Sequence, residues 1–156
     1  MRLRVIAVGT RMPRWVREAF DDYSSRLGNT LKLSLVEIEP GPRGASRPPQ
    51  QAMEREARKL LNALRKDDYI IALDEHGAEF TTRELSAWLA ARMRNGRDLA
   101  FLIGGADGLA PALLARCDFK WSLSRLTFPH ALVRVVLAEQ LYRAHSVLNH
   151  HPYHRD

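Results

Sequence analysis

The chain has 156 residues, of which 46% are hydrophobic and 27% are charged, proportions that exclude an intrinsically disordered protein. This length suits one domain with a buried core, and we expect residues 1–156 to form a single domain. The net charge of +6 indicates a basic surface suited to an acidic partner, and the lone Cys117 excludes a disulfide framework or a thiolate metal cluster.

The first half of the chain alternates apolar and amphipathic segments. Residues 3–8, "LRVIAV", predict a buried strand. This apolar run is too short for a signal peptide or a membrane span, so we expect a cytoplasmic protein with no membrane partner. Next we predict a helix over 13–27, a strand over 31–39, a loop over 40–49 and a charged amphipathic helix to about residue 65.

The second half continues the same alternation. Residues 68–74 predict a third strand, and the helix predicted over 81–95 begins with Thr81 and Glu84 at capping-box spacing. A fourth strand over 98–103, a short helix near 110–116, a short strand over 119–123 and a last helix over 130–148 follow. This pattern predicts an α/β fold, with a parallel sheet covered by helices on both faces.

The last predicted helix carries apolar side chains around most of its circumference. They are Leu132, Val133, Val135, Val136, Leu137, Leu141, Tyr142, Val147 and Leu148. A surface helix needs one apolar stripe, so this helix is either deeply buried or covered on two sides. For a chain of this size we expect one side to pack on its own sheet and the other on a second copy, which predicts a homodimer.

Ligands of open α/β sheets bind outside the carboxyl ends of the strands, so the loops at these ends matter most. The first loop, "AVGTRMPRW", lacks the glycines of a dinucleotide site, and no Lys-Ser/Thr phosphate loop is present. The loop "GGADG" after the fourth strand suits either a tight turn or close approach of backbone to a ligand. With the hydroxyls and apolar side chains of residues 122–130, it could hold a flat heterocycle.

The chain ends on "NHHPYHRD", residues 149–156, and three interpretations of this tail compete. His150, His151 and His154 are of the metal-ligating type, but they lack a nearby acidic partner and fit no strong zinc spacing. The tail is otherwise a solvated polar end or a strap that docks at a catalytic site.

The segments "LIGGADGL", "SLSRLTFPHALVRVVLAEQLYRA" and "HPYHR", in this order, closely resemble the RlmH-type ribosomal RNA methyltransferases of the SPOUT class. The resemblance covers the whole chain. It implies a SPOUT (α/β-knot) fold with a C-terminal trefoil knot, in which S-adenosylmethionine is bound at a homodimer interface. The activity implied is methylation of N3 of a pseudouridine in 23S ribosomal RNA within the assembled ribosome, without a metal.

The resemblance also implies which residues act. The cofactor site would comprise Leu73, Gly104, Gly105, Leu123, Ser124, Arg125, Leu126, Thr127 and Phe128. The catalytic group would comprise Tyr153, His154 and Arg155 of the tail, with Arg143 of the last helix. The tail would cross to the partner's cofactor, where Tyr153 contacts the base and Arg155 holds a phosphate or a developing oxyanion. His154 has the ordinary pKa best suited to proton transfer, but which residue removes the N3 proton stays open.

Four arginines, Arg11, Arg14, Arg43 and Arg47, are predicted in loops at the same edge of the sheet, where they could contact RNA phosphates. Two rival functions remain at this stage. The first is a nucleotide-binding module without catalysis, and the second is a histidine-metal hydrolase.

Overall fold

Five parallel strands form one sheet in the computed structural model, which describes residues 1–155. The strands are β1 (Arg2–Val8), β2 (Lys32–Ile38), β3 (Tyr69–Ala78), β4 (Leu99–Ile103) and β5 (Phe119–Trp121). Their order in the sheet is β2-β1-β4-β3-β5, and every neighbouring pair is parallel. The predicted parallel sheet is therefore confirmed.

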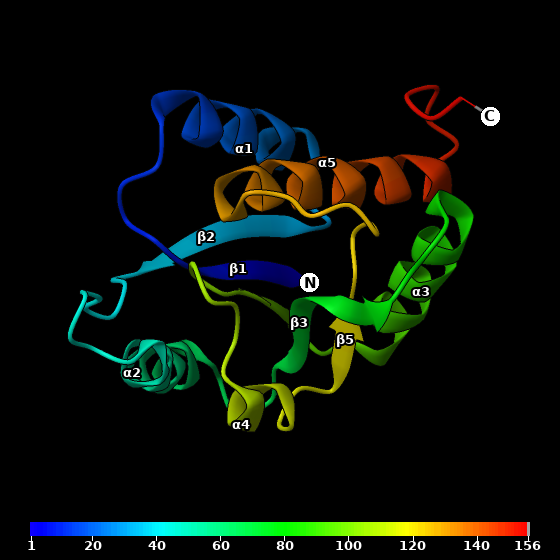
Figure 1. Ribbon diagram of the computed structural model, residues 1–156. Coiled ribbons are helices and arrows are strands. Elements are labelled where there is room, and N and C mark those ends of the chain that lie inside the picture. The colour runs from blue at the N-terminus through cyan, green and yellow to red at the C-terminus, as the bar shows by residue number, and fades with distance from the viewer. Residues whose placement is uncertain (156) are drawn as a thin grey trace.

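Helices cover both faces of this sheet, as predicted. They are α1 (Arg14–Arg26), α2 (Pro49–Ala63), α3 (Thr82–Asn95), α4 (Pro111–Leu114) and α5 (His130–Leu148). Figure 1 shows α1, α5 and α3 on one side of the sheet and α2 and α4 on the other. Two separate clusters of buried apolar side chains match these two layers. The trefoil knot that the resemblance implies stays a prediction.

The ends of two elements follow from their sequences. Thr81 and Glu84 form the predicted capping box: the Thr81 hydroxyl accepts from the Glu84 backbone N–H, and the Glu84 carboxylate accepts from that of Thr81. Gly96, at φ 73°, ends α3 in the left-handed conformation that glycine adopts without strain. Within residues 1–155, we find no helix with the length and apolar content that a membrane span requires.

Strand β3 is longer than predicted and irregular. Leu73 and Ala78 both pair with Trp121 of β5, so the residues between them bulge out of the ladder. The strand was predicted over residues 68–74, so the prediction stopped at the first residue of "DEHG". Asp74 and Glu75 of this bulge contribute to the lining of a pocket.

Packing within one chain accounts for part of the unusual apolar pattern of helix α5. It packs between α1 and α3 on the sheet, which buries Leu137, Ala138 and Leu141 completely. Leu137 therefore belongs to the core of the monomer and not to an outer face. Leu132 and Val136 remain half-buried, so an apolar strip on the outside of the helix is still available to a second copy.

The apolar pattern of α5 concealed a buried arginine. Arg134 is 0% exposed, and its Nη1 lies 2.7 Å from Oε2 of Glu37 at the end of β2. Its Nη2 donates to the carbonyl oxygens of Val8, at 3.3 Å, and Gly9, at 2.8 Å. Arg134 thus joins α5 to the ends of β1 and β2, close to the edge where ligands of such sheets bind.

The change Glu37→Gln should lower the free energy of unfolding by about 2–3 kcal/mol, because Arg134 would stay buried without a counter-charge. Urea denaturation measures this. In the matched control Glu18→Gln, which breaks the exposed Arg14–Glu18 pair, the change should stay below about 1 kcal/mol. Equal stability of the two variants would mean that the backbone carbonyls alone satisfy Arg134.

Burial of His145 in α5 gives the fold a dependence on pH. Desolvation lowers the pKa of His145 below its ordinary 6.5. The unfolded chain therefore takes up this proton at a higher pH than the folded chain, so stability falls as the pH drops below 6.5. His145 should change the free energy of unfolding by at most about 1.4 kcal/mol per pH unit. Denaturation of His145→Gln at several pH values should show a shallower slope than wild type, and an equal slope would contradict the role of His145.

Candidate active site

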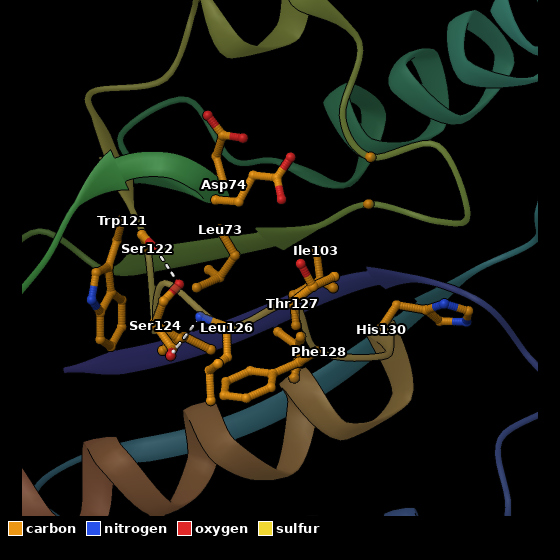
Figure 2. A pocket seen from close by; sticks show the side chains of 15 residues that line it. Leu73, Asp74, Ile103, Trp121, Ser122, Ser124, Leu126, Thr127, Phe128 and His130 are labelled. Atoms are coloured by element: carbon orange, nitrogen blue, oxygen red, sulfur yellow. Dashed lines mark hydrogen bonds between the residues drawn. The ribbon is translucent and has the colours of Figure 1, made fainter.

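A pocket opens at the carboxyl ends of three adjacent strands, β4, β3 and β5. Its lining residues are Leu73, Asp74, Glu75, Ile103, Gly104, Gly108, Trp121, Ser122, Leu123, Ser124, Leu126, Thr127, Phe128, His130 and Val133. The loops after β4 and β5, which the sequence analysis paired, flank β3 in the sheet. The end of β3 therefore completes the pocket between them (Figure 2).

The pocket gathers all of the predicted cofactor residues except Gly105 and Arg125. Gly105 faces the other way, because a Cβ atom built on it would lie 3.0 Å from Cγ1 of Val8 and 3.4 Å from the Glu56 carboxylate. The Arg125 side chain is 89% exposed and its Nε lies 3.5 Å from Oε1 of Glu79. The cofactor roles of the whole set stay a prediction.

The glycine loop forms one wall of the pocket. Gly105 and Gly108 pair as an antiparallel bridge, and Gly108 has a φ of +78°. A Cβ atom on Gly104 would lie 2.5 Å from the carbonyl carbon of Gly108 and 2.8 Å from the nitrogen of Leu109. The loop therefore folds tightly on itself, and its backbone atoms face the pocket where side chains would otherwise stand.

The segment between β5 and α5 forms the opposite wall. The Ser122 hydroxyl donates to the carbonyl of Ser124 at 2.9 Å, and the Ser124 hydroxyl accepts from the N–H of Leu126 at 3.0 Å (Figure 2). Both hydroxyls therefore stabilise the conformation of the turn itself. The turn leaves the Leu126 side chain at the lip of the pocket, 73% exposed, beside Thr127 and Phe128. An exposed leucine at a pocket mouth suits an apolar ligand surface.

Acidic side chains supply the charge of this pocket. Asp74 and Glu75 come from the bulge of β3, and none of the lining residues, all within the described chain, is a lysine or an arginine. The Asp74 side chain is 21% exposed, with Oδ1 3.8 Å from Nδ1 of His76. Neither carboxylate was among the predicted site residues, although two acidic residues directly after a buried strand were the available signal. A pocket of this charge repels phosphates and favours cationic ligands.

The tail folds back onto its own helix. The Tyr153 ring lies 4.6 Å from the Tyr142 ring, and its hydroxyl donates to Oε1 of Glu139 at 3.1 Å. Arg143 donates to the same Glu139 oxygen at 2.6 and 2.8 Å, and its guanidinium lies 4.9 Å from the centre of the Tyr153 ring. The structure thus brings together two predicted catalytic residues, Tyr153 and Arg143, through a carboxylate that the sequence analysis missed.

The tail and the pocket do not meet within one chain. Val133 is the last of the described residues to line the pocket. Figure 1 shows the red tail beyond the end of α5. The residues of α5 that line the pocket, His130 and Val133, lie at the beginning of that helix. His154 is half-buried and Arg155 is exposed. In the described part of the chain, no group of three His, Cys, Asp or Glu side chains is placed to hold a metal ion.

The surroundings of Tyr153 determine its protonation. Burial is the main cause that raises its pKa well above the ordinary value of 10, and hydrogen bonds to Tyr23 and Glu139 and the Glu139 charge act in the same direction. Tyr153 therefore keeps its proton at neutral pH and acts as a hydrogen-bond donor in this conformation.

The predicted RNA-binding arginines differ from one another in the structure. Arg11 and Arg47 are exposed in loops, as predicted. Arg14 is not in a loop: it opens α1, with its Nε 2.7 Å from Glu18. Arg43 is bound by the carboxylates of Glu56 and Asp107, so its guanidinium is already occupied.

Comparison with known proteins agrees with this architecture. The family model described as "Predicted SPOUT methyltransferase" matches residues 1–154. The chain is 53% identical to the "Ribosomal RNA large subunit methyltransferase H" of Alkalilimnicola ehrlichii, covering 99% of both chains. It is 47% identical to the protein of the same name from Methylobacillus flagellatus, covering 100% of both.

Solved structures share the fold at much lower identity. A "Probable Methyltransferase" from Bordetella pertussis Tohama I superposes with a TM-score of 0.58 at 16% identity, covering 92% of this chain and 95% of that one. A "probable methylase family protein" from Haemophilus influenzae Rd KW20 gives 0.56 at 14% identity, over 99% and 70%. The resemblance found in the sequence is thereby confirmed: the chain belongs to the SPOUT methyltransferase family.

Proposed function

We infer that this protein is an S-adenosylmethionine-dependent methyltransferase that modifies large-subunit ribosomal RNA in the cytoplasm, acting as a single-domain homodimer. One observation carries the cofactor assignment: a chain with a net charge of +6 has a ligand pocket whose charged lining residues are acidic. S-adenosylmethionine bears a cationic sulfonium and a cationic amine, and its adenine suits the apolar side chains of Leu73, Leu126 and Phe128.

The same charge argues against the dinucleotide alternative. A dinucleotide brings a pyrophosphate, which binds at glycine-rich helix N-termini or beside arginine and lysine. Here Asp74 and Glu75 would repel it. Calorimetry should therefore give a measurable affinity for S-adenosylmethionine and none for NAD, and the reverse would overturn the assignment.

The RNA substrate is supported by the relatives' names and by the surface. Arg11 is exposed ahead of α1, Arg14 is the exposed first residue of that helix, and Trp15, 53% exposed, is the second. Arginines bind phosphates, and an exposed aromatic ring can stack on an unpaired base. The resemblance specifies the target as N3 of a pseudouridine in 23S RNA, which we adopt as part of the proposal.

S-adenosylmethionine, when bound, supplies a methyl group that its positive sulfonium has already activated. What remains for the protein is to align the acceptor nitrogen with the methyl group and to assist loss of the N3 proton. Leu73, Gly104 and the segment 123–128 would hold the cofactor. Tyr153 would contact the base, by stacking on it or by a hydrogen bond. His154 is then the candidate acceptor of the N3 proton, with Arg155 holding a phosphate or the developing oxyanion.

Because none of the described tail residues lines the pocket of its own chain, we include in the proposal that the tail serves the partner's pocket. The half-buried Leu132 and Val136 on the outside of α5 support a contact between copies there. Two equivalent sites would then form in each symmetric dimer.

The change Val136→Asp should weaken the dimer by at least a factor of about 30, because the interface would bury an unpaired charge. Light scattering at several concentrations measures this. A charge on the exposed side of α1, in Asp21→Lys, should leave the dimer intact. A folded wild-type protein that is monomeric at every concentration would contradict the dimer.

The function itself is tested by transfer of a tritiated methyl group from S-adenosylmethionine. Ribosomes that lack the modification should become labelled in their large-subunit RNA, and naked RNA should be labelled much less. Absence of label from every ribosomal substrate, by a protein that binds the cofactor, would refute the RNA assignment and leave the pocket assignment in place.

A further inference from the structure

We propose that Arg43 is a positioning residue for the cofactor site, which fixes the glycine loop of the pocket to α2 by bridging Glu56 and Asp107. The inference rests on the proposed cofactor pocket and assigns to Arg43 a task different from contact with RNA.

The bridge begins at a buried carboxylate. Glu56 lies on α2 and is 2% exposed. Its Oε2 accepts from the N–H of Gly41 at 2.9 Å and from Nη1 of Arg43 at 2.8 Å, and its Oε1 accepts from Nη2 of Arg43 at 3.0 Å. A forked pair of this kind fixes the plane of the guanidinium as well as its position.

The bridge ends on the glycine loop. Nε of Arg43 donates to Oδ2 of Asp107 at 2.8 Å, and Nη1 also donates to the carbonyl of Gly41 at 3.2 Å. Every nitrogen of the guanidinium is thus engaged within the protein. The two carboxylates raise the pKa of Arg43 above its ordinary value, so the bridge is charged at any physiological pH.

The glycine loop needs such an anchor. In "GGADG", residues 104–108, Asp107 is the one residue with a polar side chain, so it offers the loop's side-chain hydrogen bond. Glycines leave the backbone many conformations, and ordering them costs entropy. Asp107 immediately precedes Gly108, which lines the pocket with Gly104. Holding Asp107 therefore holds the pocket wall in the shape that receives the cofactor, before the cofactor arrives.

The variant Asp107→Asn tests this with little risk to the fold, because Arg43 keeps its paired contact with buried Glu56. Its dissociation constant for S-adenosylmethionine should rise by about tenfold, the value of one hydrogen bond between charged groups. Arg43→Lys should give a similar loss, since a single ammonium cannot bridge both carboxylates. Asp107→Glu, which keeps the carboxylate, should recover part of the affinity.

The double variant Arg43→Lys/Asp107→Asn distinguishes positioning from general damage. Both changes break the same bridge, so the dissociation constant of the double variant should not exceed that of the more affected single variant. Hydrogen exchange should become faster at residues 105–108 in Asp107→Asn and stay unchanged in the core strands. Glu18→Gln, which breaks the exposed Arg14–Glu18 pair, should bind as wild type does.

Several results would overturn the inference. One is binding within twofold of wild type by Asp107→Asn and Arg43→Lys. Another is a loss of cofactor affinity that occurs only in variants whose melting temperature is also lowered. A third is slower methyl transfer to ribosomes by Arg43→Lys with unchanged cofactor affinity, which would return Arg43 to the RNA-binding residues. Failure of the wild type to bind the cofactor at all would instead refute the proposed function, so the two failures are distinguishable.

Discussion

Replacement of Gly104 by valine should abolish binding of S-adenosylmethionine, raising the dissociation constant by at least about 100-fold. The added Cβ would lie 2.5–2.8 Å from backbone atoms of Gly108 and Leu109, and backbone cannot rotate aside as a flexible side chain can. The glycine loop would have to open, which removes one wall of the pocket. Calorimetry of the folded variant measures the loss.

Substitutions of two other glycines provide comparisons for the effect of Gly104→Val on cofactor affinity. Gly44 has open space around it, so Gly44→Ala should bind the cofactor as wild type does. Gly105→Ala should have an intermediate effect, because its Cβ would meet the Val8 side chain at 3.0 Å. Unchanged affinity in Gly104→Val would show that the loop is a turn without a part in binding.

Truncation after Asn149 should lower the rate of methyl transfer by a factor of about 1,000 or more while leaving the fold and cofactor binding largely intact. The tail contributes Tyr153, His154 and Arg155, so alignment of the base and removal of its proton would fail together. The structural loss includes the packing of Tyr153 on Tyr142 and Arg143, its hydrogen bond to Glu139, and the contact of the His151 ring with Tyr142. A quench-flow or filter assay with ribosomes measures the rate.

Point variants separate chemistry from packing in the tail. Arg155 is exposed, so Arg155→Ala should keep the melting temperature and still lose most of the activity. His150 is exposed at φ 54°, a conformation that asparagine tolerates, so His150→Asn should remain active. Full activity of the truncated chain would reduce the tail to a polar end without function.

Much of the fold was predictable because it depends on local patterns. Short apolar runs alternating with amphipathic segments admit few arrangements other than a parallel sheet with helices on both faces. The limits of α5 were predicted correctly, at His130 and Leu148, and the capping box of α3 was recognised from its residue spacing. The lining of the pocket by residues 123–128 was anticipated through the family resemblance, apart from Arg125.

What escaped prediction depends on contacts between distant parts of the chain. Arg134 lies within an apolar run, and nothing nearby in sequence reveals that Glu37 neutralises it in the core. Arg43 was predicted as a surface residue that contacts RNA, because its pairing with Glu56 and Asp107 is visible only in the folded chain. The sequence shows two acidic residues after the buried strand, but the bulge that carries Asp74 is visible only in the pairing of two strands.

The central claim is that the pocket of one chain works with the tail of another. The most direct test combines two inactive chains, one truncated after Asn149 and one carrying Gly104→Val, each with its own affinity tag. Purification through both tags isolates the heterodimer and shows that it forms. One of its two sites would then pair an intact pocket with an intact tail, so we expect about half of the wild-type rate of methyl transfer. A purified heterodimer as inactive as its parents would contradict the claim, because it would mean that each tail serves the pocket of its own chain.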